Sequence, residues 1–340
     1  MAVRLKKLND QVMVVTGASS GIGLATARAA AKGGAKLVLA ARNGDALREL
    51  ADEIARAGGE AFAYEADVGD EAAVAHLARA AVERFGRFDT WVNNAGTSVY
   101  GEMTEIATDD HRRVFETNFW GTVYGSLEAA RHFRGRAGRY GGALINVGSI
   151  LSDRAIPIQG MYCASKHAVK GFTDSLRMEL ELAGVPVSVT LVKPASIDTP
   201  FPQHARNYMD EEPTLPPPLY HPAVVARAIL HCAATPERDV TVGGAGKAIV
   251  ATGKLAPRVT DRVMEATMTA AQKKGEPPRN PAGALHAVGG PALEERGDYS
   301  GPVLGSSAYT AAAVHPLLAG AVAIGAGLAL AAVVGRRGNA

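Results

Sequence analysis

Residues 11–23, QVMVVTGASSGIG, join a short apolar run to a turn that contains three glycines. The run is rich in β-branched residues, which predicts a buried strand, and the alanine-rich stretch that follows predicts a helix over 23–33. In such a turn Gly17 permits the tight bend, Gly21 lets the backbone approach a phosphate, and Gly23 lets the helix pack closely. The first N–H groups of the helix then point at a pyrophosphate. Glycines alone are a weak signal, but their place between strand and helix favours a dinucleotide site.

The alternation of strand and helix continues along the chain. Strands joined by helices of this length form right-handed crossovers, which build a parallel sheet with helices on both faces. The predicted strands are 11–17, 36–42, 61–67, 88–96, 142–149, 185–195 and 239–244, and the further predicted helices are 44–58, 70–86, 108–134 and 160–183.

Composition narrows the class of protein. Of the 340 residues 47% are hydrophobic and 21% charged, which is enough for a large core. The net charge is +2 without a long basic run, so nucleic acid is a poor candidate for a partner. Cys163 and Cys232 lack metal-ligand spacing and suggest no disulfide framework, so we expect no metal site and a reducing compartment. The N-terminus lacks the apolar core of a secretory signal, so we expect a cytoplasmic catalytic domain.

A proline-rich stretch, residues 196–222, breaks the rhythm of strands and helices. Ligands of parallel α/β sheets bind at the carboxyl ends of the strands, which is where a loop after the predicted strand 185–195 begins. We therefore expect this loop to cover a site. The alternative is an excursion over the surface without a function.

The end of the second predicted strand bears on the choice of nicotinamide cofactor. NAD sites usually place an acid there for the ribose hydroxyls, but AARN at 40–43 has none. Arg42 is suited to bind a 2′-phosphate, so the sequence favours NADP, with a solvated arginine as the alternative. After the third predicted strand, Asp67 and Val68 are placed to contact an adenine ring, although Asp67 could equally cap the next helix.

Five motifs occur in a telling order: TGASSGIG at 16–23, NNAG at 93–96, Asn118, Ser149 and YCASK at 162–166. In this order and spacing, over about residues 8–245, the sequence resembles the short-chain dehydrogenase/reductase family. The resemblance implies a Rossmann-like α/β fold with a doubly wound, seven-stranded parallel sheet. It also implies NAD(P)-dependent interconversion of a carbonyl and an alcohol, and a homodimer or homotetramer built on two long helices.

The resemblance also implies particular site residues. The catalytic set is Asn118, Ser149, Tyr162 and Lys166. The expected cofactor contacts are Gly17, Ser19, Ser20, Gly21, Ile22, Gly23, Arg42, Asp67, Val68, Asn94, Ala95, Gly96, Tyr162, Lys166, Pro194, Ile197 and Thr199.

The chemistry of these side chains fits proton transfer to a developing alkoxide. Tyr162 and Lys166 are four residues apart, so on a helix they share a face. A free tyrosine has a pKa near 10, and we expect the ammonium of Lys166 to lower the pKa of Tyr162 toward the working pH. Ser149 can hold the substrate oxygen, and Asn118 resembles the asparagine that completes a proton relay. The bland alternatives are a solvated Tyr–Lys face, a serine cap and an asparagine bonded to backbone.

One motif departs from the family pattern. The glycine expected after Pro194 is Ala195, so we expect the turn to use another backbone conformation, which affects the contacts of the nicotinamide but not the catalytic set. Thr199 and Ile197 remain where the family contacts the nicotinamide carboxamide.

The chain divides into three predicted parts. Residues 1–275 form the NAD(P)-binding domain, and 276–316, rich in glycine, proline and charge, form a linker or an extended arm. Residues 317–334 carry no charge, and a helix of about 18 residues spans roughly 27 Å, close to a bilayer core. This segment is predicted to be either a membrane anchor or a buried helix of an oligomer.

The sequence thus predicts an NADP-preferring oxidoreductase acting on an apolar carbonyl or alcohol. The rival from another class is a sensor or scaffold protein that binds NADP without turnover. An epimerase or dehydratase on the same fold is a nearer rival.

Overall fold

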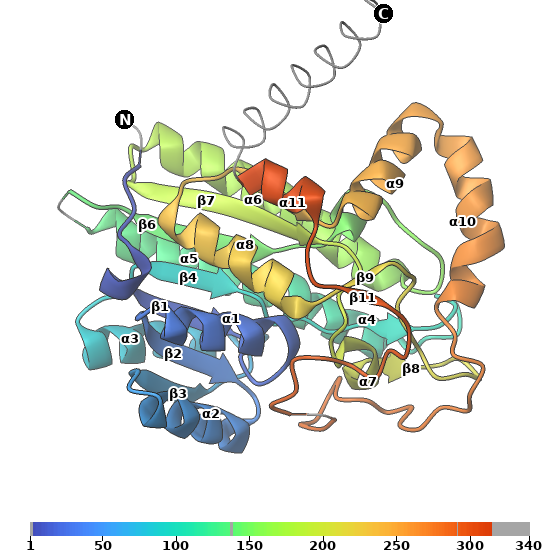
Figure 1. The fold of residues 1–340 in the computed structure, drawn as a ribbon, viewed down its shortest axis with the longest axis horizontal. Helices are drawn as coiled ribbons and strands as arrows, with labels where there is room; N and C mark the ends of the chain where they lie inside the picture. Colours follow the sequence, from blue (N-terminus) through green and yellow to red (C-terminus); the bar gives the residue numbers. More distant parts are fainter. Residues whose placement is uncertain (1–2, 137–138, 291, 315–340) are drawn as a thin grey trace, which may run out of the picture.

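The computed structural model describes residues 3–136, 139–290 and 292–314. A parallel sheet of seven strands lies at its centre, in the order β10-β7-β6-β4-β1-β2-β3 (Figure 1). The α/β fold and the seven-stranded sheet predicted from the sequence are therefore confirmed. The strands are β1 Val12–Thr16, β2 Lys36–Ala41, β3 Ala61–Glu65, β4 Thr90–Asn93, β6 Gly142–Val147, β7 Val187–Pro194 and β10 Asp239–Val242.

Helices cover both faces of the sheet, each with its own apolar core (Figure 1). One core joins the sheet to α1 (Gly21–Lys32), α2 (Gly44–Arg56) and α8 (Pro222–Ala234). The other joins it to α3 (Glu71–Phe85), α5 (Gly121–Arg134) and α6 (Gly160–Leu182). Strands buried on both faces are almost entirely apolar, which is why their sequences read as continuous apolar runs.

Local signals set the ends of several helices. The Asp70 side chain accepts hydrogen bonds from the N–H groups of Ala72 and Ala73 at the start of α3. Gly86 ends that helix with φ of +77°, a conformation that favours glycine. The predicted helix 108–134 is divided into α4 (Thr108–Phe115), a π-helical turn (Glu116–Trp120) and α5.

The order of the strands reverses beside β1. β2 and β3 continue the sheet on one side of β1, and β4, β6, β7 and β10 continue it on the other. At such a point the crossovers leave in opposite directions and open a crevice at the carboxyl ends of the strands. The topology therefore places the binding crevice beyond β1 and β4.

The proline-rich stretch 196–222 is more ordered than its sequence indicated. It contains a short helix α7 (Phe201–His204) and two short strands, β8 (Arg206–Asn207) and β9 (Leu219–Tyr220). β8 pairs with β5 (Val99–Tyr100), and β9 pairs with β11 (Val303–Leu304), far along the chain. The stretch is thus held at both ends by pairing.

Two helices after β10 were not predicted from the sequence. α9 (Gly244–Leu255) and α10 (Pro257–Ala271) form a hairpin beside the carboxyl end of the sheet (Figure 1). The chain then crosses back beneath α7 and β8, and ends its described course with β11 and α11 (Ala308–Val314), which contacts β10. The described part of 276–316 therefore packs along the domain and does not separate from it as a linker.

Among the helices of residues 3–136, 139–290 and 292–314, none is long and apolar enough to cross a membrane. The predicted apolar helix 317–334 lies outside the described residues, so the structure gives no support to a membrane anchor or an oligomer helix there.

Candidate active site

A cavity of about 310 Å³ lies in the crevice at the carboxyl ends of the strands. Of the predicted site residues, all but Gly23 and Asn118 line it. The glycine turn and Arg42 form one end of the cavity, and Tyr162 and Ser149 lie toward the other. The fold thus brings into one place residues spread over most of the sequence.

The glycine turn lies against the loop that follows β4. Gly17 and Gly21 have φ of +67° and +54°, which favours glycine at both positions. A Cβ on Gly23 would lie 2.0 Å from the carbonyl oxygen of Gly17, so Gly23 allows α1 to approach its own turn. The Asn94 amide donates to the carbonyl oxygens of Thr16 and Gly17 at 3.0 and 3.3 Å. Asn94 therefore fixes the turn relative to β4.

Helix α1 begins without a side chain that caps its N-terminus. The first amides of a helix have no partner within it and are suited to an anion. The cradle formed by Gly17 and Gly21 leaves no room for a Cβ beside Ala95 and Thr199. These features fit the pyrophosphate of a dinucleotide.

Arg42 is a partly buried cation at the same end of the cavity. Its guanidinium donates to the backbone carbonyl oxygens of Ala284 and Leu285. Among the described residues no carboxylate lies within 4.0 Å of it, although Asp67 is near enough to act through space. Burial lowers the pKa of Arg42 because it disfavours the charged form. A buried cation that lacks an ion-pair partner suits a bound anion such as a 2′-phosphate.

Asp67 lines the cavity but its carboxylate already has partners. Burial opposes its ionisation, yet the N–H of Gly69 and the ion pair with Arg113 together hold the pKa of Asp67 below its usual value. Its predicted contact with an adenine ring would therefore share oxygens with Arg113.

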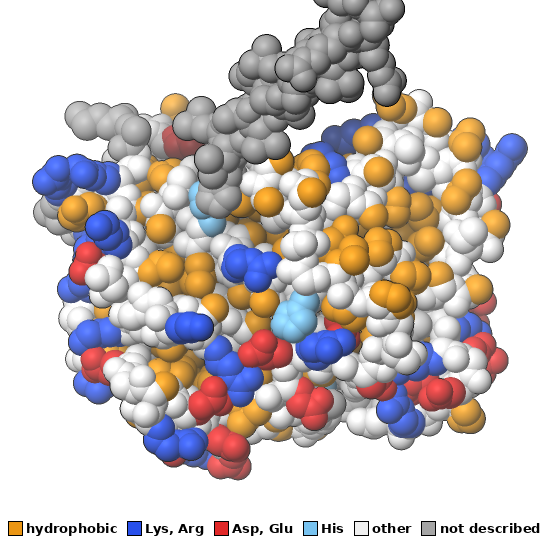
Figure 2. Space-filling model, viewed as in Figure 1, with side chains coloured by type: hydrophobic (Ala, Val, Ile, Leu, Met, Phe, Trp, Pro, Cys, Tyr) orange, Lys and Arg blue, Asp and Glu red, His pale blue; other side chains and the backbone are white. Residues whose placement is uncertain are grey.

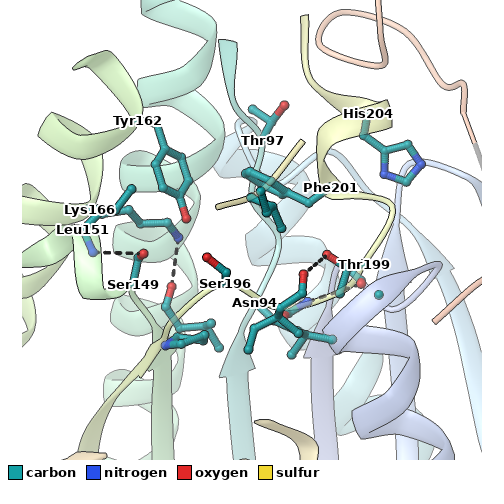
Figure 3. Close-up of a pocket in the computed structure, with 18 of the residues that line it drawn as sticks. Asn94, Thr97, Ser149, Leu151, Tyr162, Lys166, Ser196, Thr199, Phe201 and His204 are labelled. Atoms are coloured by element: carbon teal, nitrogen blue, oxygen red, sulfur yellow. Dashed lines mark hydrogen bonds between the residues drawn. The ribbon is translucent and has the colours of Figure 1, made fainter. Parts of the chain in front are cut away.

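Tyr162 and Ser149 face each other across the catalytic end (Figure 3). The Tyr162 ring also meets Phe201 edge to face, with the ring centroids 5.5 Å apart. Burial raises the pKa of Tyr162 well above its usual 10, and a hydrogen bond from Ser149 to the phenolate opposes this only in part. The prediction that Lys166 lowers this pKa is wrong for the protein without ligands, because desolvation of the phenol is the larger effect.

Lys166 lies on α6 one turn after Tyr162, as the spacing predicted. Its Nζ donates to the carbonyl oxygen of Val147 at 2.9 Å and lies 5.7 Å from the centre of the Tyr162 ring. Burial lowers the pKa of Lys166 to about 8. The solvated Tyr–Lys face that the sequence left open is excluded, because Lys166 is only 4% exposed.

Ser149 has a structural role as well as a place in the cavity. It caps a short 3-10 helix, Ile150–Ser152, and its Oγ accepts from the N–H of Leu151 at 3.1 Å. Its own N–H donates to the Ser152 hydroxyl at 3.2 Å. The cap fixes the hydroxyl of Ser149 beside Tyr162.

Asn118 lies behind the cavity wall, in the π-helical turn. It is fully buried, and its side chain accepts from the N–H of Thr97 and donates to the carbonyl oxygen of Thr97 and the hydroxyl of Ser165. Its side chain is thus occupied in joining the β4 loop to α6, as the backbone-bonded alternative expected. π-Helical turns within α-helices are frequent at functional sites.

Ala195, the departure from the family pattern, is accommodated by two glycines. A Cβ on Gly243 would lie 2.7 Å from the Cβ of Ala195, and one on Gly246 would lie 3.2 Å from it. The Ala195 N–H donates to the carbonyl oxygen of Val242 at 2.8 Å, so the residue continues the pairing of β7 with β10.

The far end of the cavity is apolar, and most of its lining was not identified from the sequence. α9 and α10 supply Ile249, Val250, Met264 and Met268. The loop that ends at β9 supplies Leu215 and three prolines, as its predicted covering role requires. Without a fold, periodic apolar residues in α9 and α10 are indistinguishable from core.

The fold and the site define a dehydrogenase of the Rossmann type. The family model described as short chain dehydrogenase matches residues 11–210. The chain therefore belongs to the short-chain dehydrogenase/reductase family.

Known relatives agree with this assignment. An uncharacterized oxidoreductase of Bacillus subtilis, YxnA, is 48% identical over 326 residues, which cover 95% of this chain and 90% of that protein. Mouse dehydrogenase/reductase SDR family member 7B is 37% identical over 196 residues, 56% of this chain and 59% of that protein. A short chain dehydrogenase/reductase of Burkholderia phymatum, solved in complex with NAD, has a TM-score of 0.67 and 28% identity, covering 75% of this chain and 96% of that one.

Proposed function

We propose that this protein transfers a hydride between NADP(H) and the carbonyl or alcohol group of an apolar small molecule. The observation that supports this most is the meeting of Tyr162, Ser149 and Lys166 in a cavity whose other end holds the glycine turn and Arg42. A sensor that only binds the cofactor has no need of a buried Tyr–Lys pair.

The residues of the turn would hold the cofactor's pyrophosphate, and Arg42 would hold the 2′-phosphate that distinguishes NADP from NAD. The bound nicotinamide supplies or accepts the hydride. The relative of known structure from Burkholderia was solved with NAD, and one from Thermococcus sibiricus, with a TM-score of 0.59, 28% identity and coverage of 68% of this chain and 95% of that one, with 5-hydroxy-NADP. The preference for NADP here rests on Arg42.

In the direction of reduction, the hydroxyl groups of Ser149 and Tyr162 donate hydrogen bonds to the substrate oxygen. As negative charge develops on that oxygen, the Tyr162 hydroxyl gives up its proton to it. The phenolate that remains is costly in this buried place. We expect the ammonium of Lys166, 5.7 Å from the ring centre, to offset part of that cost. Oxidation of an alcohol runs the same proton transfer in reverse.

The substrate proposed is apolar because of what surrounds the reacting end. Beyond Tyr162 the side chains from α9, α10 and the end of the proline-rich loop are mainly aliphatic or thioether, and Arg154 and Gln159 are polar residues in the same lining. Buried apolar surface favours ligands that lose little hydration on entry. A hydrophobic ketone, aldehyde or secondary alcohol fits this lining.

Replacement of Tyr162 by Phe tests the chemistry. NADPH absorbance would be followed with a panel of apolar aldehydes and ketones. Because general acid catalysis contributes about 10²–10⁴-fold, we expect Tyr162→Phe to lower kcat by at least about 100-fold while the affinity for NADPH stays within about threefold. Retained turnover would overturn the role.

Tyr100→Phe is the matched control. Tyr100 is fully buried, and its hydroxyl has no hydrogen-bond partner among the described residues. Removal of the Tyr100 hydroxyl should leave turnover unchanged. Wild-type protein that binds NADPH but oxidises it with no member of the panel would favour the sensor.

Replacement of Arg42 by Leu tests the choice of cofactor. Hydrogen bonds to charged groups contribute about 1.5–3 kcal/mol, so we expect NADPH to bind about 10–100-fold more weakly. NADH, which lacks the 2′-phosphate, should lose clearly less affinity than NADPH, and any loss it shows reports the contacts of Arg42 with the carbonyl oxygens of Ala284 and Leu285. Arg48→Leu, on the exposed side of α2, is the control; an equal loss for both cofactors in Arg42→Leu would contradict the assignment.

A further inference from the structure

The segment between α10 and β11 crosses the mouth of the crevice. We call residues 276–298 the arm. It is joined to the loop after β8 near its start, where the Glu212 N–H donates to the carbonyl oxygen of Glu276 at 2.7 Å and the Asn207 N–H donates to that of Pro281 at 2.8 Å. Near its end, Arg296 pairs with the buried Asp198 at 2.6 Å. The arm is therefore fastened on both sides of the cavity.

Between these ends the arm bonds directly to the glycine turn. The N–H of Leu293 donates to the carbonyl oxygen of Ser19, and the N–H of Gly21 donates to the carbonyl oxygen of Glu294, each at 2.8 Å. Next to this pairing, Glu295 forms an ion pair with Arg28 of α1 at 3.0 Å. The turn that would hold the pyrophosphate is thus in contact with the arm.

Two arginines hold the arm at the adenosine end. Arg42 and Arg113 both donate to the carbonyl oxygen of Leu285, and Arg42 also donates to that of Ala284. The Leu285 side chain is 1% exposed and packs with Val99 and other apolar residues beside β5. This part of the arm is an integral part of the domain's packing.

The arm covers the cavity without filling it. The same cavity is lined by the glycine turn on one side and by Ala284, Val288, Gly289 and Ala292 of the arm on the other. Small residues keep the arm close to the domain, since a Cβ on Gly283 would lie 2.3 Å from the carbonyl oxygen of Ala205. The arm residues that line the cavity carry no acid; Glu294 and Glu295, which follow at the glycine turn, do not line it, and Glu295 is paired with Arg28.

We propose that residues 283–290 and 292–296 form the outer wall of the dinucleotide site, closing over its adenosine half and retaining the bound cofactor. The inference rests on the proposed function, in that the cavity must take a nicotinamide dinucleotide. The wall contacts the turn and Arg42 directly and lines the same cavity as they do, so it would cover a dinucleotide bound in that cavity, and departure of the dinucleotide requires these contacts to open. Release of either cofactor is then limited by the arm.

The double variant Glu295→Ala/Arg296→Ala tests this wall. Neither residue lines the cavity, so the direct contacts of a cofactor are kept while the fastening to Arg28 and Asp198 is removed. Stopped-flow displacement, followed by NADPH and NADH fluorescence, should show both cofactors leaving at least tenfold faster. Arg48→Ala, which removes an exposed ion pair on α2, is the matched control and should release both cofactors at the wild-type rate.

Hydrogen exchange on the wild-type protein gives a second readout if the variant fails to fold. Peptides covering 283–296 should exchange more slowly with NADPH bound, whereas peptides from the far end of α3 should not change. If the double variant binds the cofactors but releases them at the wild-type rates, the proposed wall is overturned. It is also overturned if the wild-type arm exchanges at the same rate with and without NADPH. Both results leave the proposed function standing. A wild-type protein that binds neither NADPH nor NADH would overturn both.

Discussion

Lys166 is a buried charged residue that lowers the stability of the fold at a place where we expect it to serve catalysis. Its ammonium is buried, its described partner is a neutral carbonyl, and burial lowers its pKa from the usual 10.5 to about 8. Below pH 8 both the folded and the unfolded chain bind the proton, so the full cost of the buried charge is felt. Between about pH 8 and 10.5 only the unfolded chain keeps the proton, so the stability of the fold rises with pH.

This residue makes a prediction about stability. Replacing Lys166 by Met, which fills a similar volume without charge, should raise the free energy of unfolding at pH 7 by about 2–3 kcal/mol, since one pKa unit is about 1.36 kcal/mol. At pH 9.5 the advantage of Lys166→Met should shrink by more than half. Denaturant unfolding without cofactor at the two pH values measures this. A gain that is independent of pH would show that the lysine is not charged in its buried place.

Tyr162 illustrates what the sequence could and could not predict about the site. Its place beside Lys166 follows from their spacing on one helix, which fixes the side chains that share a face, and its place beside Ser149 was implied by the family resemblance. The direction of its pKa shift does not follow, because that depends on how much water the fold excludes around the phenol. The residue types and their spacing predicted the neighbours of Tyr162, whereas the direction of its pKa shift depends on the packing around the phenol.

Among the elements, α1 depends on close approach to its own turn. A Cβ on Gly23 would meet the backbone of Gly17 at 2.0 Å, where no flexible side chain can move aside. We expect Gly23→Ala to lower the free energy of unfolding by about 1–3 kcal/mol, as overpacking does, and to weaken NADPH binding.

Gly171→Ala on α6 is the matched substitution. No atom of the chain lies within 4 Å of a Cβ at Gly171, so this variant should gain roughly 0.5–1 kcal/mol from helix propensity. Thermal unfolding compares the two variants. Equal stabilities would contradict the packing argument for Gly23.

The elements found only in the structure share a physical cause. The strands were predicted because residues buried on both faces leave continuous apolar runs. α9 and α10 were not predicted because they cover a cavity with one side and expose Leu255, Val259 and Val263 on the other. They therefore lack a simple apolar stripe. β8 and β9 are two residues long each and exist through partners distant in sequence, which no local pattern can indicate.

At the scale of the whole molecule, basic and acidic residues nearly balance, 36 against 34. Figure 2 shows acidic and basic side chains intermixed in the lower part of the face it presents, and hydrophobic side chains over much of the upper part. On the described surface, several aromatic residues gather where the π-helical turn meets α5 and α6. Phe119 contacts Phe172 with 6.2 Å between ring centroids, and Trp120, which is 41% exposed, stacks on Tyr124.

We propose that this aromatic surface joins copies of the chain into a homodimer or homotetramer, since aromatic residues are enriched at interfaces. Trp120→Glu would place a charge there. We expect it to shift the protein toward monomer in analytical ultracentrifugation without loss of the fold by circular dichroism. An unchanged mass would place the interface elsewhere. Met103→Glu, at another exposed apolar side chain, is the control.

The family model ends at residue 210, before the arm begins, whereas the similarity to YxnA extends over 95% of the chain. The arm therefore lies beyond the part of the sequence that defines the family. Its composition predicted an extended segment, but the bonds to Ser19, Gly21 and Arg42 depend on the folded crevice.

The pairing of β11 with β9 ties the substrate end to chain that comes much later. The hydroxyl of Thr310 accepts a hydrogen bond from the N–H of Gly243 at 3.1 Å, so α11 supports the start of α9 as well. A protein shortened before residue 303 would leave β9 with a bare edge, and one cut near 310 would sever this support. A truncation designed to test the role of the residues after 314 should therefore keep Val314. A cut made earlier would also remove the support of β9 and α9, and we expect it to change the substrate end of the cavity.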